Sequence, residues 1–120
     1  MAFHNELGKA GEQIATDYLQ KKGYRIKARN WRYRKAEIDI IAEFDETLVV
    51  VEVKTRSSNY FGNPHDFISK EKIRLLVLAT DAYIAKNELA LQVRFDIVSV
   101  LIPPKKKITI QHLENGFLHF

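Results

Sequence analysis

Apolar and polar side chains divide the chain into two helical and five extended segments. Apolar residues recur at helical spacing over residues 5–22 and again in the segment that follows Ser69. Alternating or continuously apolar runs predict strands over residues 24–29, 37–44, 48–56, 91–102 and 108–113. The order α-β-β-β-α-β-β predicts an α/β fold, with a mixed five-stranded sheet flanked by two helices. Between the third strand and the second helix, residues 57–68 form a predicted loop that is long enough to be a binding element.

Local signals mark the ends of the two predicted helices. Asn5 is suited to cap the N-terminus of the first helix, and Gly23 is suited to end it. Ser69 is suited to cap the second helix. Glu12 lies at the edge of the apolar stripe of the first helix, so its side chain can either reach over the surface that the helix covers or remain solvated.

Residues 48–56, Leu-Val-Val-Val-Glu-Val-Lys-Thr-Arg, combine a β-branched run with three charged side chains. Because strand side chains alternate between faces, Glu52, Lys54 and Arg56 point to one face while alternate valines point to the other. A charged side chain is costly to bury unless a partner, a metal ion or a cleft compensates for the lost water. This conflict between an apolar strand and its charges indicates where a functional site is to be sought.

The preceding predicted strand supplies a second acidic side chain on the same face. If a two-residue loop joins the two strands, Phe44 pairs with Thr47, and Asp39 then lies opposite Glu52. Carboxylates that face each other across an antiparallel pair repel each other. The two acidic residues therefore need a compensating positive charge.

A divalent cation is one way to supply that charge. Mg²⁺ takes one or two protein carboxylates, here Asp39 and Glu52, and fills its other positions with water and phosphate oxygens. Lys54 can then orient or deprotonate an attacking water, or stabilise the charge that develops on the phosphorane. The alternative is a salt-bridge ladder in which Glu37 pairs with Lys54 and Glu52 with Arg56, and the residues alone favour neither interpretation.

Cations and aromatic rings alternate along the first predicted strand and the segment after it. They are Arg25, Lys27, Arg29, Trp31, Arg32, Tyr33, Arg34 and Lys35. This mixture suits a nucleic-acid backbone, with phosphates against the cations and bases or sugars against the rings. It suits equally an edge strand whose charges prevent aggregation.

Composition narrows the class of protein without selecting a function. The 120 residues predict one domain, residues 1–120, and the absence of cysteine excludes disulfides and thiolate metal sites. No apolar run approaches the roughly 20 residues of a membrane-spanning helix, and the N-terminus lacks the features of a signal peptide, so a cytoplasmic protein is expected. The net charge of +4 permits a polyanionic partner but does not require one.

Two motifs together resemble a known superfamily. The segment Glu-Ile-Asp-Ile-Ile-Ala at residues 37–42, followed by Val-Val-Glu-Val-Lys-Thr-Arg at residues 50–56, resembles the PD-(D/E)-x-K nucleases. The chain is similar more narrowly to the YraN family of predicted endonucleases, which resemble Holliday junction resolvases in fold. Supporting matches include Gly-Lys-Ala-Gly-Glu at residues 8–12, Phe-Gly at residues 61–62 and Arg-Phe-Asp at residues 94–96. Ile38 replaces the nominal proline of the superfamily, and Ala36 replaces a glycine usual in the family.

The resemblance implies a restriction-endonuclease-like core, and the leading hypothesis is an endonuclease that hydrolyses DNA, with branched or structured DNA as one candidate substrate. In such a core Asp39, Glu52 and Lys54 are catalytic, and Asp39 and Glu52 bind Mg²⁺ or Mn²⁺, with Glu12 as a further acidic contributor. The cations expected to contact nucleic acid are Arg29, Arg32, Arg34 and Arg56.

Several alternatives and secondary expectations accompany this interpretation. The chain can instead be a nucleic-acid-binding module that keeps the fold without turnover, or a protein-interaction domain with a salt-bridged sheet face. A homodimer is possible, because resolvases cut two strands symmetrically. Arg94 and Asp96 are expected to form an ion pair beside the site, the four histidines are not expected to bind metal, and residues 105–107 are expected to form a basic turn.

Overall fold

The computed structural model describes residues 2–57 and 68–116, and their side chains from residue 6 onward. The elements in chain order are α1 (Ala2–Lys21), β1 (Arg25–Tyr33), β2 (Ala36–Phe44), β3 (Thr47–Arg56), α2 (Lys70–Asn87), β4 (Gln92–Leu101) and β5 (Thr109–Leu113). This order confirms the predicted α-β-β-β-α-β-β arrangement. Most of the loop predicted for residues 57–68, with its Phe-Gly motif, lies outside the described residues.

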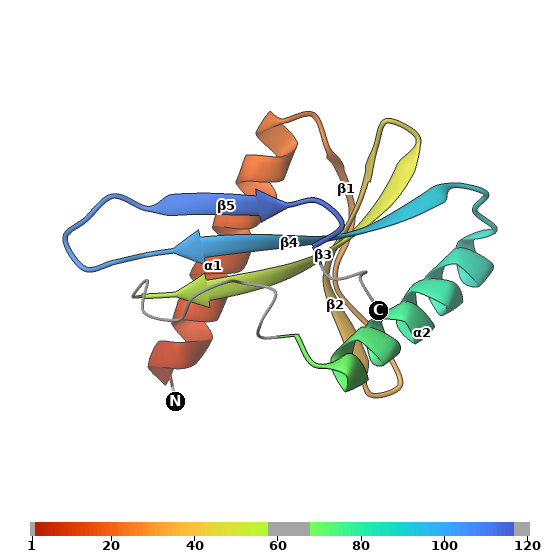
Figure 1. Ribbon diagram of the computed structural model, residues 1–120, viewed down its shortest axis with the longest axis horizontal. Coiled ribbons are helices and arrows are strands. Elements are labelled where there is room, and N and C mark those ends of the chain that lie inside the picture. The colour runs from red at the N-terminus through yellow and green to blue at the C-terminus, as the bar shows by residue number, and fades with distance from the viewer. Residues whose placement is uncertain (1, 58–67, 117–120) are drawn as a thin grey trace.

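All five strands form one mixed sheet, in the order β1-β2-β3-β4-β5. The pair β3 and β4 is parallel and the other three pairs are antiparallel, because α2 carries the chain back across the sheet between β3 and β4. Figure 1 shows that the sheet is strongly twisted: β1 and β2 run nearly at right angles to β4 and β5 in this view. The fold is consistent with the restriction-endonuclease-like core that was predicted.

Each helix covers one face of the sheet with its own apolar cluster. The α1 cluster includes Ala15, Leu19, Val49, Val51 and Val98, and the α2 cluster includes Leu48, Val50, Leu76, Tyr83 and Ile97. Figure 1 shows α1 behind β3, β4 and β5, and α2 beside β2. The alternation of β3 between the two clusters confirms that its valines at positions 49, 51 and 53 share a face. None of the helices in the described part of the chain is long and apolar enough to cross a membrane.

The helix ends follow the predicted signals with one exception. Gly23 adopts φ +97°, and the N–H of Tyr24 donates to the carbonyl of Leu19 at 3.0 Å, which ends α1 as expected. Ser69 caps α2, since its Oγ accepts from the N–H of Lys72 at 3.1 Å. The predicted cap at Asn5 is wrong: α1 begins at Ala2, because no glycine or proline before Asn5 interrupts the helix.

The β2–β3 hairpin has the two-residue loop that the pattern predicted. Asp45 and Glu46 adopt φ of 51° and 60°, as a type I′ turn requires. Phe44 consequently pairs with Thr47, and the ladder continues to the pair of Ile40 and Val51. The predicted register is therefore confirmed over these five pairs.

Strict alternation fails in β1 and near the start of β2. The β1–β2 register shifts between Ile26 and Ala28, so Lys27 is an extra residue in β1. Strict alternation over residues 24–29 predicts one face for Ile26 and Ala28; this prediction is wrong, because Ile26 packs in the α1 cluster and Ala28 packs in the α2 cluster. Strict alternation over residues 37–44 likewise predicts one face for Ile38 and Ile40, but Ile38 packs in the α2 cluster and Ile40 in the α1 cluster.

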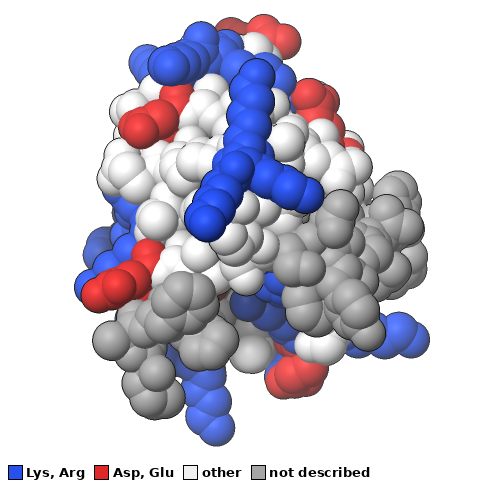
Figure 2. All heavy atoms as spheres, turned by 90° about the vertical axis from the view of Figure 1, so that its left-hand side faces the viewer, with Lys and Arg blue, Asp and Glu red and all other residues white. Residues whose placement is uncertain are grey.

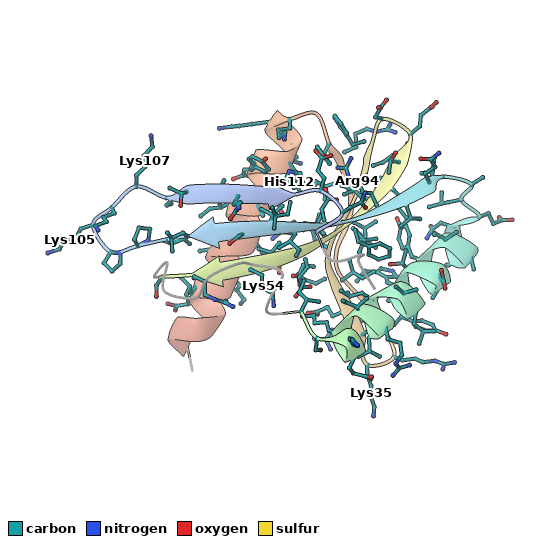
Figure 3. The ribbon with its side chains drawn as sticks, in the orientation of Figure 1. Lys35, Lys54, Arg94, Lys105, Lys107 and His112 are labelled. Carbon is teal, nitrogen blue, oxygen red and sulfur yellow. The ribbon has the colours of Figure 1, made fainter. Side chains whose placement is uncertain are left out.

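The β4–β5 connection forms the predicted basic turn. Lys105, Lys106 and Lys107 are exposed in this turn, after Pro103 and Pro104. Figure 2 looks onto this end of the molecule, where long basic side chains project from a largely uncharged surface. In Figure 3 Lys105 and Lys107 lie at the far tip of the hairpin, well apart from Lys54.

Candidate functional site

A cleft opens where β2 and β3 separate. Their ladder ends at Ile40 and Val51, while β2 stays paired with β1 as far as Ala36. The cleft has a volume of about 630 Å³. Its lining residues come from α1, β1, β2, β3 and α2: Leu7, Gly8, Lys9, Glu12, Arg32, Glu37, Asp39, Glu52, Val53, Lys54, Thr55, Arg56 and Lys72. The structure thus brings together Asp39, Glu52 and Lys54, the three residues predicted to be catalytic.

Glu52 is the deepest charged group in the cleft. Its side chain is 3% exposed, and its Oε2 lies 2.6 Å from Nζ of Lys72 and 3.7 Å from Nζ of Lys54. Within the described part of the chain, its Oε1 is the one buried side-chain polar atom without a hydrogen-bond partner. Buried carboxylate oxygens are seldom left unpaired, because desolvation is costly. Oε1 is therefore a buried acceptor without a partner among the described residues, on a side chain that lines the cleft.

Asp39 adopts an unusual state because it is buried beside Glu52. Its Oδ2 accepts a hydrogen bond of 2.8 Å from the backbone N–H of Val53. Burial, followed by the negative charge of Glu52, raises the pKa of Asp39 to about 7, although the Val53 hydrogen bond acts in the opposite direction. Burial and the charge of Glu52 therefore both disfavour the ionised form of Asp39.

Lys54 lies next to this acidic pair with little access to solvent. Its side chain is 15% exposed, and burial lowers its pKa although the charge of Glu52 acts to raise it. Figure 3 shows Lys54 below β3, on the side where α2 begins. A lysine with a lowered pKa is more readily available as a neutral amine, which can accept a proton.

Lys72 belongs to the site but was not predicted from the sequence. Burial lowers the pKa of Lys72, but the charge and hydrogen bond of Glu52 and the charge of Asp39 raise it by more, so it exceeds the ordinary value. A signal did exist: Lys72 lies three residues after the cap Ser69, where a cation opposes the helix dipole. Such a residue needs a compensating anion, which here is Glu52.

Glu12 reaches the cleft from α1. Of the two predictions for its side chain, the one in which it extends over the surface covered by the helix is confirmed. Its carboxylate contacts Nη2 of Arg29 at 3.4 Å and Nδ2 of Asn30 at 3.1 Å, and its charge acts on the pKa of Asp39. The neighbouring Gly11 allows this approach, because a Cβ there would overlap with the side chain of Thr55 on β3. The close packing of helix on strand therefore places Glu12 over the opened end of the sheet.

The acidic residues fit a magnesium-type site better than a site with three protein ligands. Among the described residues, no group of three or more histidine, aspartate or glutamate side chains is arranged to hold a metal ion. Asp39 and Glu52 remain as an adjacent pair with the unpaired Oε1. Two carboxylates completed by water and phosphate oxygens form an ordinary Mg²⁺ environment. The role of Glu12 as a metal ligand stays a prediction.

The four arginines predicted to contact nucleic acid fall into two groups. Arg32 and Arg56 line the cleft, with Arg32 paired to Glu37 at 3.0 Å. Arg29 and Arg34 are not among the described lining residues: the bulge in β1 turns Arg29 toward Glu12, and the guanidinium of Arg34 lies 5.1 Å from the ring centre of Tyr33. The predicted ladder paired Glu37 with Lys54 and Glu52 with Arg56. In the structure Glu37 pairs with Arg32, and Glu52 pairs with Lys72.

The Arg94–Asp96 ion pair forms, but not beside the cleft. Arg94 donates to both oxygens of Asp96 at 2.9 Å, and His112 lies 2.7 Å from the same carboxylate. Asp96 pairs in register with Val51 of the α1 cluster, whereas Glu52 pairs with Ile97 of the α2 cluster. The ion pair therefore lies on the opposite face of the sheet from Glu52, and Figure 3 shows Arg94 and His112 together, away from Lys54.

Fold and cleft together define an α/β protein with a carboxylate pair and two lysines at the opened end of a mixed sheet. The family described as "Uncharacterised protein family UPF0102" matches residues 11–100, and the chain belongs to this family, which is also that of YraN. A UPF0102 protein of Flavobacterium psychrophilum is 52% identical over 120 residues, which cover all of both chains. A UPF0102 protein of Phocaeicola vulgatus is 50% identical over 117 residues, which cover 98% of this chain and 96% of the relative.

Proposed function

We propose that this protein is a metal-dependent endonuclease that hydrolyses phosphodiester bonds of DNA. The observation that carries the proposal is the pairing of Asp39 with the buried Glu52, whose Oε1 is unpaired within the described residues, next to Lys54. Most buried side-chain oxygens in structural networks are hydrogen-bonded, so the unpaired Oε1 favours a ligand at this position. The resemblance of residues 37–42 and 50–56 to nuclease motifs agrees with this geometry.

Asp39 and Glu52 would hold Mg²⁺ or Mn²⁺ at the base of the cleft. When bound, the ion would polarise the scissile phosphate and lower the pKa of a coordinated water. Lys54 would accept a proton from the attacking water at Nζ or stabilise negative charge on the phosphorane, and its lowered pKa suits the first role.

The rim of the cleft supplies the charges for a nucleic-acid backbone. Arg32, Arg56 and Lys9 line it from three different elements, so they can contact successive phosphates. The proposed DNA substrate is branched or otherwise structured. Symmetric cutting of two strands would require a second copy of the chain.

Cleavage assays with active-site variants test this function. Purified protein is incubated with Mg²⁺ or Mn²⁺ and with supercoiled plasmid, linear duplex and a synthetic four-way junction. We expect cleavage of at least one substrate, a loss of roughly 100-fold or more in Glu52→Gln and Lys54→Ala, and retention in Glu43→Gln, a β2 variant outside the cleft. Undiminished cleavage by both active-site variants, prepared free of contaminating nuclease, would exclude the assignment.

A second function, nucleic-acid binding without turnover, is favoured by one specific contact. Lys72 already places a positive charge 2.6 Å from Glu52, so the protein can compensate that carboxylate without a metal ion. This alternative requires salt-sensitive binding that is independent of metal and survives Asp39→Asn. Binding of that kind, combined with no cleavage of any substrate, would select it over the endonuclease.

A further inference from the structure

Lys72 is held against Glu52 although its position in α2 is unfavourable for a cation. It occupies the first turn of the helix, where the partial charge of the helix end is positive. Nζ nevertheless approaches Oε2 of Glu52 to 2.6 Å, while 44% of the side chain stays exposed. The contact therefore joins a fixed, buried anion to a long side chain that retains access to the cleft.

Two lysines share one oxygen of Glu52. Nζ of Lys72 and Nζ of Lys54 both approach Oε2, at 2.6 Å and 3.7 Å. A divalent cation between Asp39 and Glu52 would come within a few ångströms of both ammonium groups, and like charges at such distances repel strongly in a partly buried site. Lys54 has little room to leave, since its side chain is 15% exposed, whereas Lys72 can move outward.

We propose that Lys72 is a resident cation that competes with the divalent metal ion for Glu52, and that a phosphate backbone promotes metal binding by drawing Lys72 away. The proposal rests on the endonuclease function proposed above. It makes Lys72 a positioning residue that couples substrate binding to assembly of the metal site.

The surroundings of Lys72 provide the second anion partner that this exchange requires. Lys72 lines the same cleft as Arg32, Arg56 and Lys9, the cations expected to hold phosphates. A nucleic-acid backbone on these cations would place further phosphates within the cleft that Lys72 already enters. The ammonium group would then exchange one anion for another instead of becoming unpaired.

Linkage fixes what this exchange predicts for binding. If the phosphate backbone releases Glu52 for the metal ion, nucleic acid must raise metal affinity by the same factor by which metal raises nucleic-acid affinity. Without the charge of Lys72, the metal ion should bind tightly even in the absence of nucleic acid. The coupling between metal binding and nucleic-acid binding should then be weaker.

Direct measurement of Mn²⁺ binding tests the proposal without relying on turnover. Free Mn²⁺ is followed by electron paramagnetic resonance, with and without a short phosphorothioate duplex that resists cleavage. The proteins are wild type, Lys72→Met and Lys72→Gln, with Lys70→Met as the control that removes a charge from the same turn of α2. The glutamine variant keeps a hydrogen-bond donor for Glu52, which protects the comparison if the methionine variant folds poorly.

We expect both Lys72 variants to bind Mn²⁺ about tenfold more tightly than wild type without DNA, which is within the usual range of coupling energies. The duplex should tighten Mn²⁺ binding to wild type and Lys70→Met by a similar factor, and to the Lys72 variants by less than about threefold. Equal or weaker Mn²⁺ binding by the Lys72 variants would overturn the proposal.

The outcomes also separate this inference from the function on which it rests. If wild type cleaves DNA and binds Mn²⁺ in a manner abolished by Glu52→Gln, but the Lys72 variants behave as wild type, the endonuclease stands and the competition is wrong. If no protein shows binding of Mn²⁺ that depends on Glu52, both the metal site and the competition are wrong.

Discussion

The Oδ2 atom of Asp39 accepts a 2.8 Å hydrogen bond from the backbone N–H of Val53, just beyond Ile40 and Val51, the last ladder pair of β2 and β3. The side chain thus takes the place of a main-chain acceptor at the point where the strands part. The backbone N–H of Val53 in β3 therefore keeps a hydrogen-bond acceptor although the β1–β2 hairpin diverges from β3 at this point. A side-chain oxygen at position 39 therefore caps the backbone of β3 at the opening of the cleft.

Asp39 should make the metal-free protein less stable as the pH rises. Its folded-state pKa of about 7 lies above the ordinary value of 3.8, so between these values the folded protein binds more protons than the unfolded chain. The free energy of unfolding therefore falls as the pH rises from about 4 to about 7, by an amount on the order of 2–4 kcal/mol.

Asp39→Asn removes this titration while keeping an oxygen that can accept from Val53. Urea unfolding in the presence of a chelator, at pH 5 and pH 8, should show that wild type loses stability relative to the variant. Parallel pH profiles of the two proteins would show that Asp39 is not held in this environment.

Gly11 should be intolerant of even a methyl group. Gly11→Ala would place Cβ against the side chain of Thr55 and push α1 away from β3, so we expect a loss of about 1–3 kcal/mol, typical of overpacking. Gly8→Ala is the matched control in the same helix. A Cβ at Gly8 meets none of the described atoms within 4 Å, so higher helix propensity should stabilise the protein by up to about 1 kcal/mol. Equal melting temperatures for the two variants would contradict this packing.

The hairpin that carries the site was predictable because β3 and the second half of β2 alternate clearly and a two-residue loop leaves one register. Asp39, Glu52 and Lys54 could therefore be placed on one face before the structure was known. The bulge at Lys27 was not predictable, since an extra residue in an edge strand leaves the pattern of polar and apolar residues plausible in either register. Because of the bulge, the pattern predicts the wrong face for Ala28, and it does not reveal the contact of Arg29 with Glu12.

The contact of Lys72 with Glu52 was beyond sequence reasoning for a different reason. Periodicity predicts which face of α2 is buried, but not where along the sheet the first turn of the helix comes to rest. Two residues separated by a long loop can therefore form an ion pair that neither local pattern reveals. The unfavourable position of Lys72 in the first turn was the one available signal.

Asp96 should be essential for stability but not for the proposed chemistry. Its side chain is fully buried, and hydrogen bonds from His112, Arg94 and the N–H of Asn115 lower its pKa despite burial, which acts to raise it. Asp96→Asn would leave the guanidinium of Arg94 with the exposed Glu114, at 3.5 Å, in place of its buried counter-charge, and we expect a loss of about 3–5 kcal/mol near pH 7. The difference in stability should diminish as the pH falls below about 4. Asp96 then becomes protonated in the unfolded wild-type chain, so the ionised carboxylate contributes less to the free energy of unfolding.

Asp81→Asn, on the exposed side of α2, provides the control for the change at Asp96. Denaturant unfolding of the three proteins gives the comparison. If Asp96→Asn were as stable as Asp81→Asn, the buried ion pair would contribute little.

The two cleft arginines should account for measurable parts of the salt dependence of DNA binding. Each phosphate contact that is lost lowers the slope of log affinity against log salt by about 0.9 for duplex DNA. Arg32→Gln and Arg56→Gln should each show this change because both residues line the cleft. Arg25→Gln is the control, because Arg25 is exposed on the same strand as Arg32 but pairs with Glu43 outside the cleft. Fluorescence anisotropy at several salt concentrations, in Ca²⁺ or chelator to prevent cleavage, gives the slopes.

Equal slopes for wild type and both cleft variants would place the DNA on another surface, and the basic turn at residues 105–107 would then be the first region to test.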